Sequence, residues 1–348
     1  MGSLKPTILD PFCDERRPVK AIFSDIKEAR QKIQKYVQVT QCTFSEPVSE
    51  EYGIRLYFKK EFQQSTASFK VRGGANAMLR LTEDQKRSGV ISASAGNHAQ
   101  ALAHMGKRLR IPVTVVMPTN APKVKVESCR KQGANVVIFG TDFAAAKQHA
   151  MELGLNNGLV YINGYDHPDV ISGQGTVGLE IAEQVPDVDA CVVPVGGGGL
   201  IAGVATALKT LKPDIKIYGV ECECSTGFTQ SLQVGAPITV LSDPTIADGL
   251  SVSRPGVNAL ETAKSLVDKM VTVKEESVHD AVFKLLVTEK ATVEGAGAVG
   301  LAAIMEGLLP ELKNKTVVVI LSGGNIDPGT LLKVIERKVR VEAPIIMK

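Results

Sequence analysis

The chain has 348 residues, of which 44% are hydrophobic and 22% are charged, and its formal net charge is +3. This composition is typical of a globular protein, and so small a net charge, spread along the chain, excludes a basic stripe for nucleic acid. No apolar run reaches the ~18 residues of a membrane helix, and the N-terminus lacks the apolar core of a signal peptide. We therefore expect a cytoplasmic protein with no nucleic-acid or membrane partner, whose six cysteines are reduced.

Short apolar stretches alternate with helical patterns along most of the chain. The predicted strands cover residues 111–116, 135–139, 191–195, 215–220 and 316–321. The predicted helices cover residues 97–109, 122–132, 143–153, 175–184, 277–288 and 328–337. Strands that alternate with helices favour parallel sheets covered by helices, so the pattern predicts an α/β fold.

In chain order, the first candidate for chemistry is Lys70, in the segment Ser68-Phe69-Lys70-Val71-Arg72-Gly73-Gly74. Its close neighbours are mostly small or apolar, and burial among such groups lowers the pKa of an ammonium group. The neutral amine that results can form a Schiff base with an aldehyde. The alternative is a solvated charged patch at the start of a helix, which Lys70 would share with Lys59, Lys60 and Arg72.

The second segment, Ser92-Ala93-Ser94-Ala95-Gly96-Asn97-His98, leads into the predicted helix 97–109. The N–H groups at a helix start, together with Ser and Asn side chains, form a site for a carboxylate. The alternative is an ordinary helix cap made by Ser94 or Asn97. His98 by itself is more typical of a polar structural residue than of a catalyst.

The third segment is the glycine run 196–199 followed by Leu200, at the end of the apolar stretch 190–195. Backbone without Cβ atoms can approach an anion closely, and free N–H groups at a helix start attract phosphate. The run is neither a Walker loop nor a G-x-G-x-x-G dinucleotide motif. The alternative is a tight strand-to-helix turn that needs glycine for its geometry alone.

An amine, a helix-opening polar loop and a phosphate cradle are the parts of a pyridoxal phosphate (PLP) enzyme. The chain resembles the fold-type-II PLP enzymes, which are tryptophan synthase β-like, and within them the serine/threonine dehydratase and serine racemase family. Within that family, the chain is most similar to the short L-threonine dehydratases, which lack a regulatory domain. The resemblance runs from about residue 61 to 327 through Ser-Phe-Lys-x-Arg-Gly, Ser-Ala-Gly-Asn-His-Ala-Gln, Gly-Gln-Gly-Thr (173–176), the glycine run, Glu-Gly-Ala-Gly-Ala (294–298) and Ser-Gly-Gly-Asn (322–325).

The resemblance implies a role for each motif. Lys70 would hold PLP as a Schiff base and then remove the Cα proton of the substrate. Asn97 would bind the ring 3′-oxygen, and Ser322 would meet the pyridine nitrogen. The residues implied to contact the cofactor are Lys70, Phe69, Asn97, Gly196, Gly197, Gly198, Gly199, Leu200, Glu294 and Ser322. The residues implied to surround the substrate are Ser94, Ala95, Gly96, Asn97 and His98.

The implied activity is that of an L-threonine/L-serine ammonia-lyase. β-Elimination from an external aldimine would give 2-oxobutanoate or pyruvate plus ammonia. A serine at the pyridine nitrogen leaves the ring largely unprotonated, which suits prompt loss of a β-hydroxyl better than transamination. An alternative of a different class, a PLP-binding protein that has lost its chemistry, is disfavoured by the intact Lys70 and Asn97.

The other alternative is serine racemase. Racemisation needs an acid/base on each face of the planar carbanion, and Ala95 stands where the racemases carry a serine. Threonine dehydratases resemble the chain in having Ser-Ala-Gly-Asn here, so dehydratase is favoured. Ser92, Ser94 or His98 is left as a replacement for the missing group.

The resemblance supports a divalent cation only weakly. The family pairs a glutamate with an aspartate six residues later, and Glu221 matches, but Gly227 replaces the aspartate. Glu223 is the nearest substitute, because hard cations need clustered oxygens. The pair Cys222 and Cys224 falls short of a zinc pattern, which needs four ligands.

The resemblance also implies an organisation. A small domain, residues 89–166, would be inserted between the halves 1–88 and 167–348 of a large PLP-binding domain. The enzyme would be a homodimer that acts on a small amino acid. The 23 residues that follow Asn325 are too few for the C-terminal regulatory domain of biosynthetic threonine dehydratases, so we expect none.

Overall fold

The structure, a computed structural model, describes residues 10–342 and contains two β-sheets covered by helices. The larger sheet has the strand order β1-β2-β10-β7-β8-β9. Its strands are β1 (Cys42–Phe44), β2 (Arg55–Lys60), β10 (Thr316–Leu321), β7 (Ala190–Pro194), β8 (Lys216–Cys222) and β9 (Lys269–Val273). Neighbouring strands are parallel, except that the edge strand β1 is antiparallel to β2. The predicted α/β class with parallel sheets is confirmed.

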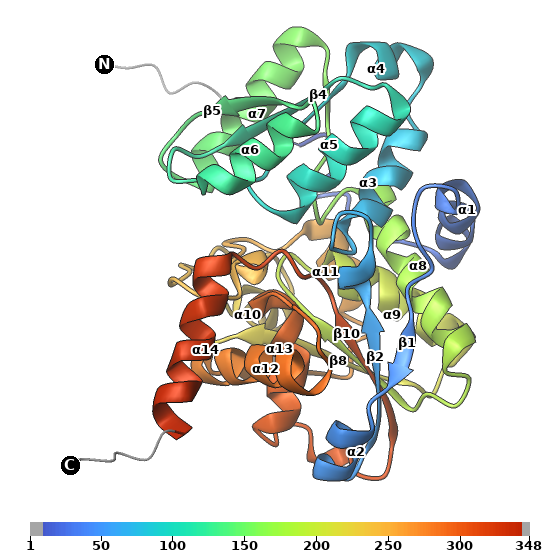
Figure 1. Ribbon diagram of the computed structural model, residues 1–348. Helices are drawn as coiled ribbons and strands as arrows, with labels where there is room; N and C mark the ends of the chain where they lie inside the picture. Colours follow the sequence, from blue (N-terminus) through green and yellow to red (C-terminus); the bar gives the residue numbers. More distant parts are fainter. Residues whose placement is uncertain (1–9, 343–348) are drawn as a thin grey trace, which may run out of the picture.

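The smaller sheet has parallel strands in the order β5-β4-β3-β6. Its strands are β5 (Asn135–Ile138), β4 (Val113–Met117), β3 (Val90–Ala93) and β6 (Val160–Tyr161). The helices packed on it include α5 (Asn97–Leu109), α6 (Lys123–Lys131) and α7 (Phe143–Asn157). In Figure 1 these elements form the upper layer, above the six-stranded sheet. We keep the division at residues 89 and 166 as a proposal.

Of the remaining helices, α4 (Glu83–Ser88) lies in the upper layer of Figure 1, and the others cover the larger sheet or join the two layers. These others are α1 (Phe23–Ile33), α2 (Glu46–Tyr52), α3 (Lys70–Leu79), α8 (Pro168–Gln184), α9 (Gly199–Leu211), α10 (Gly227–Val234), α11 (Val257–Ala263), α12 (Glu275–Thr288), α13 (Gly295–Met305) and α14 (Pro328–Glu342). Helix α3 packs on both α8 and α5, so it links the two layers (Figure 1).

Helix α8 begins at Pro168, earlier than the predicted start at residue 175. Proline suits the first position of a helix, and Nδ1 of His167 accepts a hydrogen bond from the N–H of Asp169. The glycines near the start of this helix serve packing. A Cβ at Gly173 would lie 2.7 Å from the carbonyl oxygen of Arg72, so glycine lets α3 and α8 approach closely.

The central strands of the larger sheet are buried on both faces. In β10, Val317, Val319 and Leu321 pack into one hydrophobic cluster. Val318 and Ile320 pack into another on the opposite face. Successive side chains of a strand point to opposite faces, so a doubly covered strand reads as a continuous apolar run. This explains why the sequence predicted the bounds of β10 correctly.

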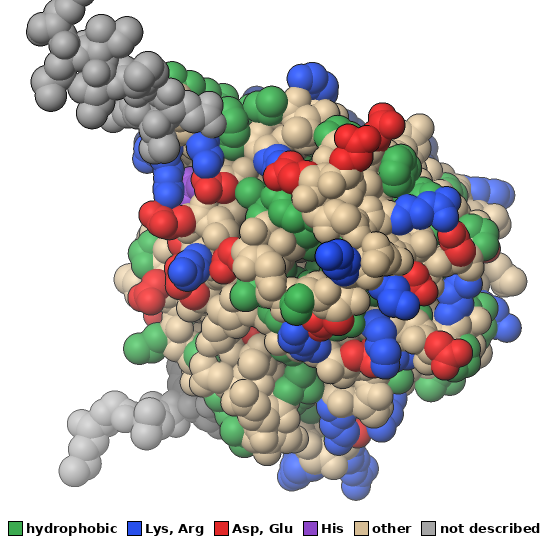
Figure 2. Space-filling model, turned by 90° about the horizontal axis from the view of Figure 1, so that it is seen from below, with side chains coloured by type: hydrophobic (Ala, Val, Ile, Leu, Met, Phe, Trp, Pro, Cys, Tyr) green, Lys and Arg blue, Asp and Glu red, His purple; other side chains and the backbone are tan. Residues whose placement is uncertain are grey.

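The described residues contain no helix that is both long and apolar enough to cross a membrane. On the face shown in Figure 2, Lys and Arg side chains are interspersed with Asp and Glu. This mixture agrees with the small net charge of the chain.

Candidate active site

A cavity of about 800 Å³ receives residues from loops of both sheets. The small sheet contributes the segments 93–98, 118–125 and 141–147, and the large sheet contributes the segments 194–200 and 248–253 with Ser322. These loops include the carboxyl ends of β3, β7 and β10, where ligands of parallel α/β sheets bind. The predicted cofactor and substrate residues all line this cavity: Phe69, Lys70, Ser94, Ala95, Gly96, Asn97, His98, Gly196, Gly197, Gly198, Gly199, Leu200, Glu294 and Ser322.

Lys70 is the first residue of α3, and its amine points to the loop after β6. Nζ donates a hydrogen bond of 2.7 Å to the carbonyl oxygen of Gly164 and lies 5.2 Å from the centre of the Phe69 ring. Burial lowers the pKa of this amine to about 8, and the nearby carboxylate of Glu294 opposes part of that shift. A substantial neutral fraction is therefore present near physiological pH, as a nucleophile requires.

A chain of hydrogen bonds holds the side chain of Asn97. Its Nδ2 donates to Glu294 at 2.6 Å, and its Oδ1 accepts from Nδ2 of Asn325 at 2.8 Å. Burial raises the pKa of Glu294 to about 7, with a further contribution from Asp248. Glu294 is thus divided between its protonated and ionised forms near neutral pH, inside the cavity that holds the Lys70 amine.

The glycine run forms a tight turn between β7 and α9. Within residues 10–342, no hydrogen bond engages the N–H groups of Gly196, Gly197 or Gly198. Gly198 has a left-handed φ of +92°, and Cβ atoms at Gly197 and Gly198 would lie 2.3 Å and 2.2 Å from the rings of Tyr165 and Phe228. Glycine is therefore needed for the turn itself, and the turn leaves three donors at a helix start free for an anion.

Comparison with known proteins assigns the chain to a family. The model of the family "Pyridoxal-phosphate dependent enzyme" matches residues 33–323, which is most of the chain. The chain belongs to that family. The resemblance stated from the motifs, and with it PLP as the cofactor, is confirmed.

Relatives within the family act on amino acids according to their names. The chain is 43% identical to an L-threonine ammonia-lyase of Thermotoga maritima, over 90% of the chain and 78% of that protein. It is 41% identical to a catabolic L-threonine dehydratase of Staphylococcus aureus, over 91% of the chain and 92% of the relative. Maize serine racemase has a similar structure, with a TM-score of 0.86 and 35% identity over 92% of the chain and 98% of the maize protein.

The residues present fit the cofactor of the family. The unpaired N–H groups of the glycine run suit a phosphate, and the Lys70 amine suits an aldehyde. The side chain of Ser322 lines the cavity, is buried, and forms no hydrogen bond within the described residues, so its hydroxyl is free for a ring nitrogen. Lys70, the glycine run and Ser322 come from three separate stretches of the chain that the fold brings to one cavity.

Segment 94–98 of this PLP-dependent enzyme, which the resemblance implies to surround the substrate, is held by local hydrogen bonds. Oγ of Ser94 accepts from the N–H groups of Gly96 and Ala99, each at 3.3 Å. The His98 ring donates from Nε2 to the carbonyl oxygen of Ile162 at 3.2 Å, so its Nδ1 carries no proton. Burial lowers the pKa of His98 to about 3. His98 is a neutral residue, and both it and Ser94 have structural partners.

The charged residues near Lys70 do not form a solvated patch. Lys59 and Arg72 are fully buried, so that alternative is wrong for both of them. Arg72 pairs with Glu61 and Glu180, and Lys59 pairs with Glu180 at 2.5 Å. This ionic pairing offsets the free-energy cost of removing the charged groups from water.

Glu221 lies outside the cavity. Its two carboxylate oxygens accept from the N–H groups of Phe228 and Thr229, at 2.8 Å and 2.9 Å, at the start of α10. Glu223 instead accepts from the N–H of Glu275 at 2.9 Å. The two carboxylates that the sequence offered as cation ligands thus have separate partners.

Sequence reasoning missed the loop after β6. Gly164 accepts the Lys70 hydrogen bond, and Tyr165 packs against Gly197 and Gly199 of the glycine run. The loop follows a strand of only two residues, Val160–Tyr161, which is too short for a periodic pattern to reveal. The turn-forming residues Asn163 and Gly164 were the available signal.

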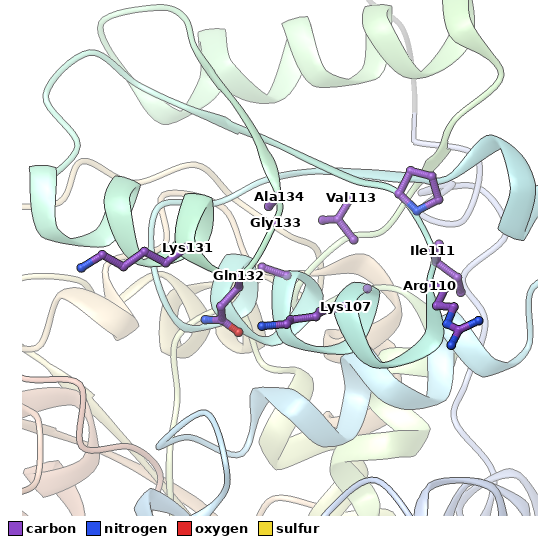
Figure 3. A pocket seen from close by; sticks show the side chains of 11 residues that line it. Lys107, Arg110, Ile111, Val113, Lys131, Gln132, Gly133 and Ala134 are labelled. Carbon is purple, nitrogen blue, oxygen red and sulfur yellow. The ribbon is translucent and has the colours of Figure 1, made fainter.

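A second hollow, of about 320 Å³, lies at the other end of the smaller sheet (Figure 3). Lys107, Arg110 and Lys131 surround it, at or next to the last turns of α5 and α6. Cations at these positions complement the partial negative charge of helix C-termini, which accounts for their presence. None of the predicted site residues lines this hollow.

Proposed function

We propose that the chain is an L-threonine/L-serine ammonia-lyase that releases ammonia and a 2-oxo acid. One cavity carries the proposal. It holds the Lys70 amine, whose pKa is lowered, together with the unpaired N–H groups of the glycine run that can bind a phosphate, and it has alanine at position 95. The names of the relatives in Thermotoga and Staphylococcus support the same reaction. The roles assigned to individual residues are part of the proposal.

The proposed chemistry divides between cofactor and protein. PLP supplies the electron-withdrawing system that acidifies the substrate Cα–H. Lys70 provides the amine that holds the cofactor and afterwards accepts the Cα proton at Nζ. The N–H groups of Gly196, Gly197 and Gly198 bind the phosphate, and the Ser94–His98 loop binds the substrate carboxylate at the start of α5.

Serine racemase is the second candidate, supported by the similarity to the maize enzyme. A racemase needs a second proton donor, and the methyl group of Ala95 is not one. The hydroxyl of Ser92 is fully buried and donates to the carbonyl oxygen of Ile162 at 2.7 Å. His98 is neutral and bonded to the same carbonyl group. The Ser92 hydroxyl and the His98 N–H are thus engaged elsewhere, which favours the lyase.

Chiral product analysis tests the proposal. With L-threonine or L-serine, the enzyme is expected to release 2-oxo acid at least tenfold faster than it forms D-amino acid. A general acid typically contributes on the order of 10²- to 10⁴-fold, so its absence at position 95 should keep racemisation slow. Ala95→Ser should raise the racemised share, because it places a hydroxyl group on the cavity wall. Equal rates of D-serine and pyruvate formation by the unmodified enzyme would refute the lyase assignment.

Assembly and location belong to the same proposal. The resemblance to the dehydratase family favours a homodimer in the cytoplasm, with a small amino acid as substrate. Gly227 in place of the family's aspartate leaves Glu221 without a partner carboxylate, which argues against a tight divalent cation at that residue. Sedimentation analysis of the purified holoenzyme, with and without a chelator, tests the dimer and the cation together.

A further inference from the structure

Two thiols and a carboxylate converge on the face of the larger sheet that lies away from Glu221. Cys222 ends β8, Cys224 follows two residues later, and Glu275 is the first residue of α12. One ligand atom from each of Cys222, Cys224 and Glu275 lies within 4.8 Å of the other two. Because side chains alternate along a strand, Cys222 and Glu221 point to opposite faces, so the two sites are distinct.

The distances match the edges of a tetrahedral metal site. Oε2 of Glu275 lies 3.3 Å from Sγ of Cys222 and 3.7 Å from Sγ of Cys224. Bond lengths of about 2.3 Å for Zn–S and 2.0 Å for Zn–O place sulfur and oxygen ligands about 3.5 Å apart at the tetrahedral angle. A cation can therefore enter among these three atoms with only small adjustments of the side chains.

We propose that Cys222, Cys224 and Glu275 bind a thiophilic divalent cation of the zinc class. His279, one turn further along α12, lies outside this three-residue group, with its Nε2 3.8 Å from Oε1 of Glu275. Its Nδ1 is buried and has no hydrogen-bond partner among the described residues. On binding, each thiol releases one proton to solvent, and the two thiolates with the carboxylate coordinate the metal.

The site is connected to the wall of the active-site cavity. Oε1 of Glu275 accepts from the N–H of Ile246 at 2.7 Å, and Oε2 accepts from the hydroxyl of Thr245 at 2.6 Å. The chain reaches the cavity wall two residues later, at Asp248. A metal ion bound to the Glu275 carboxylate weakens the hydrogen bonds that this carboxylate accepts from Thr245 and Ile246. Slower turnover is therefore expected, a consequence that rests on the proposed lyase function.

Titration of the holoenzyme with Cd²⁺ tests the site without reference to activity. Cadmium bound by thiolates gives an ultraviolet charge-transfer band, and we expect this band to saturate at one Cd²⁺ per chain and to be displaced by Zn²⁺. The Cys222→Ser and Cys224→Ser variants should lose most of the band. Cys42→Ser, which removes a thiol on β1, is the matched control and should retain it.

Two further measurements keep the outcome unambiguous. Cys222 is fully buried, so circular dichroism must show that its variant is folded, whereas Cys224 is only partly buried. Glu275→Gln should weaken Cd²⁺ binding at least tenfold while both thiols remain. A wild-type protein without the band, an undiminished band in both folded cysteine variants, or unchanged affinity in Glu275→Gln overturns the three-ligand site. If Cd²⁺ binds but lyase turnover does not change, only the proposed effect of the metal on the active-site cavity is refuted.

Discussion

At the scale of single residues, the proposed chemistry depends on how burial shifts the protonation of Lys70 and Glu294. Burial lowers the pKa of the Lys70 amine to about 8 and raises the pKa of the Glu294 carboxyl to about 7. Both shifts have the same physical cause, because a low-dielectric environment disfavours the charged form of either group. The two groups therefore change protonation within the same narrow range of pH.

The pH dependence of cofactor loading follows from the Lys70 pKa. Only the neutral amine attacks an aldehyde, so the loading rate of the cofactor-free protein should rise with pH and level off above about 8. A solvated lysine would keep gaining rate toward its ordinary pKa of about 10.4. Stopped-flow absorbance of PLP binding between pH 6 and pH 10 distinguishes the two, after correction for ionisation of PLP itself.

Borohydride reduction should attach the cofactor to Lys70. Peptide mapping by mass spectrometry locates the label, and a label on another lysine would contradict the assignment. Lys70→Ala should bind PLP loosely and lose at least a thousandfold in turnover, because the covalent link and the Cα base disappear together. Lys60→Ala, which changes a partly buried lysine of β2, is the control expected to be labelled normally.

At the scale of elements, the strand-to-helix turn at the glycine run combines a backbone constraint with a steric one. Gly198 adopts φ of +92°, and a Cβ there would lie 2.2 Å from the Phe228 ring. At Gly197, a Cβ would lie 2.3 Å from the Tyr165 ring. The geometric interpretation and the phosphate interpretation of these glycines are therefore compatible, because the same turn that requires glycine also exposes the N–H groups.

A paired substitution separates backbone strain from loss of the site. Gly198→Ala should destabilise the protein by more than 1 kcal/mol and weaken PLP binding at least tenfold, because the turn must shift away from Phe228. Gly235→Ala places alanine at another left-handed position, with φ of +82°, where its Cβ meets nothing within 4 Å. It should lose stability through strain alone and keep its PLP affinity. Thermal unfolding and PLP titration report the two effects.

At the scale of the whole molecule, a buried ionic network links the elements around the base of α3. Arg72 donates to Glu61 through Nε at 2.8 Å and to Glu180 on α8 through Nη1 at 2.6 Å. Lys59 of β2 reaches the same Glu180 and also donates to the carbonyl oxygen of Thr40 at 2.7 Å. Arg72 lies two residues from Lys70, so the network fixes the start of α3 relative to β2 of the larger sheet and to α8.

Removal of one partner from that network should be costly. Arg72→Met leaves two buried carboxylates with Lys59 as their remaining cation, and we expect a loss of about 3–5 kcal/mol in unfolding free energy. Arg55→Met breaks an exposed pair with Asp187 and should change stability by less than about 1 kcal/mol. Urea denaturation of both variants measures the difference in unfolding free energy. Equal losses would show that the buried network contributes no more to stability than the exposed pair.

The local sequence determined the features that depend on neighbours in the chain. The apolar run of β10, the helix that starts at Asn97, the collar of small residues around Lys70 and the glycine run were all readable, because strand burial, helix starts and turns have short-range causes. These motifs, in their order, also sufficed to predict the family and its cofactor.

Only the tertiary structure decided which distant residues meet. The contacts of Asn97 with Glu294 and Asn325, and of Lys70 with Gly164, join positions about 90 to 230 residues apart. The sequence left Arg72 in a patch that could be solvated, whereas packing of α3 against α8 buries it beside two carboxylates. No local pattern encodes such partners, because burial and long-range pairing arise when separate elements pack together and exclude water.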